Sequence, residues 1–296
     1  MPSKRHVRFQ NGQITLAGWF YTPNTPTAAP CIIMAHGFSA LKEHYLDSFA
    51  RVFAQAGLCV LAYDNRHFGE SDGTPRQEVN TAEQQSDMRQ AITYAQQQAE
   101  VNGERIGLWG TSFSAGIALA VAAEDARVHC VVAQVPFIGG YLSSLKTSHP
   151  KKWQTLNHQY AAEEKALKAG HSPTTIAVVL DKETRSAVIK LPEATAFFTC
   201  VPTWKNQVTL LSLKQAGEFD VTDDINRITR TPVLFIVANR DSVNATTLAL
   251  SAYEQLKTTK QLVMIDGEHF APYVEQFDLC SKRACDWFRQ HLMTSG

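Results

Sequence analysis

The sequence predicts a doubly wound α/β fold, with a mostly parallel sheet that opens on an antiparallel hairpin and carries a long helical insertion. Three observations predict this class. The N-terminal stretch has the pattern of a β-hairpin, short apolar runs alternate with helical patterns from Pro30 onward, and this alternation stops between Phe137 and Asp224. A chain of 296 residues can form one such domain with an insertion.

The hairpin is expected over His6–Gln10 and Ile14–Tyr21, which the dipeptide Asn11-Gly12 joins. Asn-Gly favours a two-residue hairpin turn because both central positions of that turn need a positive φ angle. The chain therefore opens with two antiparallel strands.

Six later runs are short, apolar and uninterrupted, which is typical of strands buried on both faces of a parallel sheet. They are Cys31–Ala35, Cys59–Tyr63, Ile106–Trp109, Val128–Ala133, Val233–Val237 and Gln261–Ile265. Helical patterns lie between them, at about Tyr45–Gln55, Thr81–Gln98, Ala115–Ala123, Thr246–Leu256 and Tyr273–Leu292. This alternation predicts parallel strands that crossover helices connect.

The segment Phe137–Asp224 has no comparable strand and is too long for a structureless loop. It contains a mixed-charge helical stretch and large apolar side chains, among them Phe197, Phe198 and Trp204. We therefore predict a helical lid over residues 137–224 and an α/β-core over residues 1–136 and 225–296. The alternative is an ordinary second layer of core helices.

Composition limits the partners of the chain. The 28 basic and 28 acidic residues give zero net charge, which argues against nucleic acid and against an anionic membrane surface. No apolar run reaches the roughly 18 residues of a membrane span. The N-terminus lacks the apolar region of a signal peptide, and the six cysteines form no Cys-x-x-Cys pair. We expect a cytoplasmic protein with reduced cysteines in its core.

The stretch around Gly110-Thr111-Ser112 predicts a nucleophile elbow, because an apolar run ends at a serine among small residues and an alanine-rich helix follows. A serine on so sharp a turn needs small neighbours two positions before and after it. Ser114 takes the place of the usual second glycine and is the weaker candidate, since Ser112 and not glycine precedes it by two. Gly-x-Ser also occurs by chance in many strand-to-helix turns.

A serine nucleophile needs a base and an acid, and in this kind of fold they follow it in the order Asp or Glu, then His. Asp241 follows the Val233–Val237 run, and His269 follows the Gln261–Ile265 run. Each residue alone has a structural interpretation, Asp241 as a helix cap and His269 as an ordinary surface or core histidine. Asp224 and Asp266 are the alternative acids. Together, the three residues lie at the carboxyl ends of strands in the required order.

The expected oxyanion donors are the backbone N–H groups of Phe38 and Phe113. His36, beside the first of these, is interpreted as a brace for its loop rather than as the base. Asp64 and Arg66 are interpreted as a structural ion pair. No metal or nucleotide motif is present, so neither a metal nor a cofactor is expected.

These residues together resemble the α/β-hydrolase superfamily over nearly the whole chain outside the lid. More specific stretches resemble its polyketide-transferase-like branch, near the Xaa-Pro dipeptidyl-peptidase-like enzymes: His36–Ser39, Asp64–Arg66, Phe68–Ser71, Leu108–Ser114, and Val208–Leu213 running on to Pro232. The resemblance implies Ser112 as nucleophile, Asp241 as acid and His269 as base. Ser114 in place of glycine, and Val243-Asn244-Ala245 in place of the common Thr-Pro, depart from the pattern.

The sequence therefore predicts a serine hydrolase that cleaves a small-molecule carboxylic ester or thioester through an acyl-enzyme. Phe197, Phe198 and Trp204 are expected to bind the acyl group. One alternative is an acyltransferase that passes an acyl or polyketide thioester to an alcohol or amine. Another is a non-catalytic ligand-binding protein on a hydrolase scaffold. The residues leave open whether the chain acts alone or as a homodimer.

Overall fold

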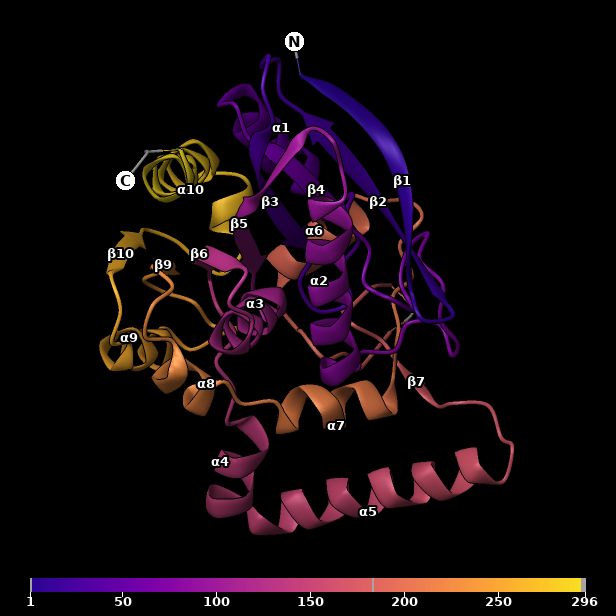
Figure 1. Cartoon of the computed structure of the whole chain (residues 1–296). Helices are drawn as coiled ribbons and strands as arrows, with labels where there is room; N and C mark the ends of the chain where they lie inside the picture. The colour runs from indigo at the N-terminus through magenta and orange to yellow at the C-terminus, as the bar shows by residue number, and fades with distance from the viewer. Residues whose placement is uncertain (1, 183, 294–296) are drawn as a thin grey trace.

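The computed structural model describes residues 2–182 and 184–293, and these residues form one eight-stranded sheet with helices on both faces. Figure 1 shows α10 and α1 above the row of strands β5, β6, β9 and β10, and α3 and α9 below it. The predicted doubly wound α/β-class is confirmed.

The strands of the sheet are ordered β1-β2-β4-β3-β5-β6-β9-β10. They span β1 (Ser3–Asn11), β2 (Ile14–Thr22), β3 (Ala29–Ala35), β4 (Cys59–Tyr63), β5 (Val101–Thr111), β6 (Val128–Gln134), β9 (Val233–Ala238) and β10 (Lys260–Ile265). The pairs β1–β2 and β2–β4 are antiparallel, and all the others are parallel. The predicted hairpin is present, but its turn lies one residue later than expected: Asn11 ends β1 and pairs with Ile14, and the two central residues are Gly12, with a φ of 62°, and Gln13.

Five of the six predicted parallel strands have buried central residues, but the prediction that both faces are covered is wrong for β10. This strand lies at the edge of the sheet, where Met264 is 43% exposed. The apolar run predicts a strand correctly but does not indicate its place in the sheet.

The core helices form two groups. The first is α1 (Leu46–Gln55) with α10 (Phe277–Leu292), and the second is α2 (Thr81–Gln96), α3 (Phe113–Glu124), α8 (Thr222–Arg227) and α9 (Thr246–Gln255). The last helix begins at Phe277 and not at Tyr273, because Ala271–Tyr273 form a separate 3-10 turn, η1, and Val274 leaves the helical region.

Helices also dominate the segment 137–224. It holds α4 (Tyr141–Ser148), α5 (Pro150–Lys168), β7 (Thr175–Ile176), α6 (Pro192–Thr199), β8 (Val208–Thr209) and α7 (Leu210–Glu218). Figure 1 shows α4 and α5 projecting from the body, with α7 between α5 and the core. A separate small apolar cluster around Leu142, Leu145 and Tyr160 holds this arm together. The expected boundary at Asp224 falls inside α8, whose Ile225 is buried in the main core.

All six cysteines are free thiols. The prediction that they are core residues holds for five of them and is wrong for Cys200, which is exposed just after α6. Within the described residues, no helix is long and apolar enough to cross a membrane.

Candidate active site

Ser112 lies on a strained turn between β5 and α3, with φ 55° and ψ −120°. Gly110 is required there, because a Cβ at this position would lie 2.4 Å from the carbonyl oxygen of Ser114. Ser114 itself fits without a glycine, since its buried hydroxyl donates to the carbonyl oxygen of Ala35 over 2.7 Å. The turn presents the hydroxyl of Ser112 at the N-terminus of α3, where the helix dipole favours negative charge.

His269 joins Ser112 to Asp241 through two hydrogen bonds. Its Nδ1 lies 2.8 Å from Oδ2 of Asp241, and its Nε2 lies 3.0 Å from Oγ of Ser112. A carboxylate can only accept, so Nδ1 carries the proton of the neutral imidazole and Nε2 accepts from the serine hydroxyl. The structure thus brings together the three residues that the sequence predicts. The alternative acid Asp266 is exposed and pairs with Arg240, away from His269.

The loop of Asp241 shapes this arrangement. Its other carboxylate oxygen, Oδ1, accepts from the backbone N–H groups of Val243 (2.9 Å) and Asn244 (2.7 Å). The side chain of Asn244 then reaches across the site and donates to the carbonyl oxygen of Val135 over 2.8 Å, while the same nitrogen lies 3.4 Å from Oγ of Ser112. Asn244 contacts the serine but is not among the site residues predicted from the sequence. Its position three residues after Asp241 is the one signal that could have indicated it.

The two predicted oxyanion donors lie beside Ser112. Gly37 lets the loop of Phe38 approach Ser112, because a Cβ at Gly37 would lie 3.2 Å from Cβ of Ser112. In the described part of the chain, neither the N–H of Phe38 nor that of Phe113 donates to another protein group. Phe113 is the first residue of α3, whose N–H has no partner within the helix. Both donors are thus available to a ligand.

His36 has the bracing arrangement that the sequence suggests. Its Nε2 accepts from the backbone N–H of Asn65 over 3.0 Å, and its Nδ1–H donates to the carbonyl oxygen of Gly37 over 2.9 Å. Burial lowers the pKa of His36 to about 4. The ring is therefore neutral near pH 7, with both nitrogens already in use.

The predicted ion pair between Asp64 and Arg66 is wrong. Arg66 binds Asp87 through two nitrogens, at 2.7 and 2.6 Å, on helix α2. Asp64 instead pairs with the ammonium of Lys42, which is fully buried, over 2.6 Å. No pattern in the sequence predicts this pair, because a lone lysine in a loop is usually a surface residue.

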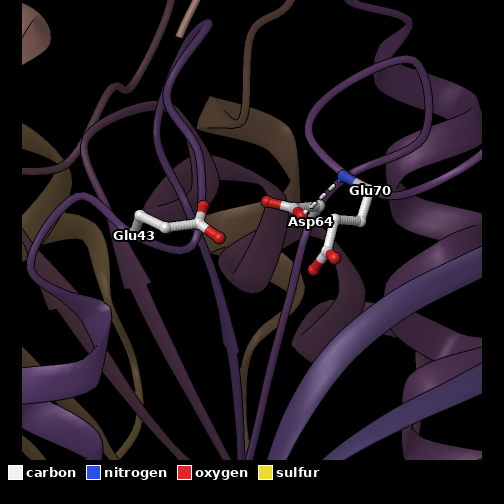
Figure 2. Close-up of side chains that lie close together, drawn as sticks. All are labelled: Glu43, Asp64 and Glu70. Carbon is white, nitrogen blue, oxygen red and sulfur yellow. Dashed lines mark hydrogen bonds between the residues drawn. The ribbon is translucent and has the colours of Figure 1, made fainter. Parts of the chain in front are cut away.

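Lys42 also explains a cluster of carboxylates that resembles a metal site. Figure 2 shows Glu43, Asp64 and Glu70 converging from neighbouring loops. Nζ of Lys42 lies 2.9, 2.6 and 2.7 Å from an oxygen of each. Burial disfavours the charge of Lys42, but the carboxylates outweigh this effect and raise the pKa of its ammonium. The ammonium thus takes the place that a cation would need.

A cavity of about 770 Å³ opens from Ser112, and residues of the segment 137–224 form much of its lining. Among its described lining residues, the charged side chains are Lys152 and Lys190, and no carboxylate is present. Most of the others are apolar, including Phe137, Ile176, Leu213, Phe197, Phe198 and Phe270.

Phe197 and Phe198 line this cavity as expected, but Trp204 does not. Its indole stacks on Phe198 with 4.9 Å between ring centroids, and its Nε1–H donates to the carbonyl oxygen of Ser39 over 2.8 Å. The expectation that Trp204 forms part of the acyl wall is therefore corrected, because its polar edge faces the loop of Phe38.

A serine on this turn, at the carboxyl edge of a mostly parallel sheet and hydrogen-bonded to a histidine that an aspartate holds, defines an α/β-hydrolase. The chain matches the family model described as X-Pro dipeptidyl-peptidase (S15 family) over residues 12–271, and it belongs to this family.

Individual relatives agree with this class. The chain is 29% identical to the quorum-quenching protein AidA of Acinetobacter baumannii (strain MDR-ZJ06), over 96% of this chain and 94% of that one. It is 28% identical to the thiohydrolase aneE of Aspergillus aculeatus, over 79% of this chain and 76% of that one. The crystal structure of the α/β-hydrolase GrgF from Penicillium sp. sh18 superimposes with a TM-score of 0.86 at 24% identity, over 99% and 100% of the two chains. The chain is therefore an enzyme of the α/β-hydrolase class.

Proposed function

We propose that the protein is a serine hydrolase that cleaves a carboxylic ester or thioester through an acyl-enzyme. The observation that carries this proposal is the hydrogen-bonded chain from Ser112 through His269 to Asp241, at the mouth of an apolar cavity. This arrangement suits acyl transfer, because the base lies within reach of the nucleophile and a third group orients the base.

In the acylation step, Oγ of Ser112 attacks the carbonyl carbon of the substrate, and its proton passes to Nε2 of His269. The carbonyl oxygen becomes an oxyanion, which the N–H groups of Phe38 and Phe113 bind. His269 then gives the proton to the departing alcohol or thiol, the bond to that group breaks, and the acyl group stays on Ser112. Asp241 stabilises the imidazolium that forms between the two transfers.

In the second step, water attacks the acyl-enzyme as His269 takes its proton, and Ser112 leaves with that proton. The second candidate is transfer of the acyl group to an alcohol or amine, which the same acyl-enzyme permits. The size of the cavity supports it, since about 770 Å³ can hold an acceptor beside an acyl chain.

The cavity lining favours one class of substrate. Its apolar walls suit an apolar acyl group, and Phe197 and Phe198 can contact that group from the lid segment. A dipeptidyl-peptidase substrate carries an N-terminal ammonium, which needs a carboxylate partner when it leaves water. Among the described lining residues only lysines are charged, so we propose neutral or anionic substrates. The thiohydrolase name of one relative supports thioesters among them.

The experiment measures kcat/KM on p-nitrophenyl esters of increasing chain length and on acyl thioesters, for the unmodified chain and for Ser112→Ala. We expect turnover of at least one series and a loss of roughly 10³-fold or more in the variant, with residual activity from the oxyanion donors. Ser114→Ala is the matched control, because it removes a hydroxyl two residues away and should keep most of the activity. Equal loss in both variants contradicts the proposal.

A further inference from the structure

The loop His36–Tyr45, called here the oxyanion loop, carries the proposed donor Phe38 in a conformation that needs support. Two of its residues that are not glycine have positive φ angles, Ser39 at 59° and Tyr45 at 65°. Side chains make such conformations unfavourable, and they persist where surrounding contacts hold them. Those contacts decide how accurately the N–H of Phe38 is placed.

One set of contacts comes from the core. His36 is tied to the loop after β4 through Asn65, and the ammonium of Lys42 is held by Asp64 of the same loop. These bonds fix both ends of the stretch that contains Phe38, and the N–H of Ala40 closes a turn between them by donating to the carbonyl oxygen of Gly37 over 3.2 Å. The carbonyl oxygen of Ser39 in this turn is bound by a partner from another segment.

That partner is the lid segment. The indole N–H of Trp204 donates to the carbonyl oxygen of Ser39, one residue after Phe38, over 2.8 Å. Ser39 is 1% exposed and Trp204 is 9% exposed, so water has little access to replace this bond. A lid tryptophan thus holds the peptide next to the proposed oxyanion donor.

His44 makes a second link between the loop and the lid. Its Nδ1 accepts from the backbone N–H of Leu41 over 3.0 Å, so its Nε2–H donates to the carbonyl oxygen of Phe198 over 3.1 Å. The ring also stacks on Phe197, with 5.2 Å between centroids. Burial lowers the pKa of His44 to about 4, which keeps the ring neutral and this pattern of bonds intact near pH 7.

We propose that Trp204 and His44 are positioning residues that make the lid segment hold the oxyanion loop in its reactive geometry. The inference rests on the proposed function. Oxyanion donors are effective only within about 2.7–3.1 Å of the developing charge, so a small shift of the loop lowers the rate. Phe197 and Phe198 line the cavity and also contact His44. The segment that contacts the acyl group therefore also helps to place the N–H of Phe38.

The test compares reaction with ground-state binding in Trp204→Phe, which keeps an aromatic ring and removes the N–H. A trifluoromethyl ketone reports the oxyanion site, because Oγ of Ser112 adds to its carbonyl carbon, His269 takes the proton, and the former carbonyl oxygen becomes the bound oxyanion. We expect kcat/KM on a short ester and affinity for this ketone to fall together, each by about 10-fold. This loss is smaller than the loss on removing an oxyanion donor, because the N–H of Phe38 is displaced and not removed. Affinity for the matched alcohol, which cannot form the adduct, should change less than about 2-fold.

Trp153→Phe is the matched control, because Trp153 lies on α5 of the same segment, packs against the small apolar cluster of the arm and does not line the cavity. It should leave kcat/KM and ketone affinity unchanged. His44→Phe removes the second link while keeping an aromatic ring, and should lower kcat/KM and ketone affinity in the same way as Trp204→Phe.

Two results would overturn this inference. One is a Trp204→Phe enzyme that matches the Trp153→Phe control. The other is an equal loss of affinity for the ketone and the alcohol, which would make Trp204 part of the binding wall only. Ser112→Ala separates this failure from failure of the proposed function, because turnover that this change leaves undiminished refutes the function itself.

Discussion

The backbone of Ser112 explains why a glycine lies two positions before the proposed nucleophile. Its φ of 55° is unfavourable for a serine, and the turn exists because Gly110 lets the backbone of α3 approach. The sequence predicts this turn from spacing alone, since close backbone approach demands a glycine at a fixed offset. It also predicts Asp241 and His269, because carboxyl ends of parallel strands meet at one edge of the sheet.

Other residues of the site were beyond prediction for a physical reason. Lys42 and Trp204 act through contacts between segments far apart in the chain, and nothing in their neighbours signals the partner. The prediction of an Asp64–Arg66 pair is wrong for the same reason. The two residues are close in the sequence, but Asp64 pairs with Lys42 and Arg66 pairs with Asp87 of α2.

Asp241→Asn should lower kcat by about 10³- to 10⁴-fold with little loss of stability. An amide at this position can no longer hold Nδ1 of His269 in its protonated form, and it stabilises the imidazolium poorly. Steady-state kinetics and thermal unfolding check both parts. Asp266→Asn, on the exposed pair with Arg240, should stay within a few-fold of the unmodified enzyme. An inactivating effect of Asp266→Asn instead would move the acid to that residue.

Two buried histidines should make the fold sensitive to acid. Burial lowers the pKa of both His36 and His44 to about 4, whereas the unfolded residues titrate near 6.5. Below about pH 6.5 the unfolded chain therefore binds protons that the folded chain does not, so stability falls as pH falls and the loss is complete below about pH 4.

Urea denaturation at pH 7 and pH 5 measures this effect. We expect the free energy of unfolding to drop by roughly 2 kcal/mol for each histidine over that range. In His44→Phe the drop should be about half as large. A pH-independent unfolding energy in the unmodified chain would mean that these rings are not held neutral.

At the scale of elements, periodicity predicts what each segment is, and packing decides where it ends. Strand β4 matches its predicted bounds at Cys59–Tyr63, because Gly57 and Asp64 interrupt the apolar run. Helix α10 starts later than expected, since the turn η1 and Val274 intervene after Tyr273. Strand β10 is half exposed although its sequence is apolar, because its place at the sheet edge is a property of topology.

Helix α6 supplies part of the wall of the cavity through Phe197 and Phe198, so a change there should alter chain-length preference. Phe197→Ala removes a ring from the lining and leaves space beside Phe198 and Phe270. We expect kcat/KM for long acyl esters to rise relative to short ones by about 10-fold, as each fitted methylene contributes about 1 kcal/mol or more.

The p-nitrophenyl ester series measures this ratio. Trp153→Ala, at a position of α5 that does not line the cavity, should leave the ratio unchanged. An unaltered profile in folded Phe197→Ala would place acyl selection elsewhere in the cavity.

At the scale of the whole molecule, the α/β-core and the segment 137–224 contribute different parts of the site. The core brings three residues from separate strands to one edge, and the additional segment covers that edge with an apolar cavity and bonds to the oxyanion loop. The sequence predicts the position and helical character of this segment, because it interrupts the strand rhythm. It does not predict that α4 and α5 form a projecting arm with a small core of their own.

The central claim is that Ser112 is the nucleophile, and covalent labelling tests it most directly. The protein is treated with a fluorophosphonate, and intact mass followed by peptide mapping locates the adduct. The account predicts one adduct per chain, on Ser112, which is absent in Ser112→Ala and present in Ser114→Ala. An adduct that persists in Ser112→Ala, or that maps to another residue of the unmodified chain, would contradict it.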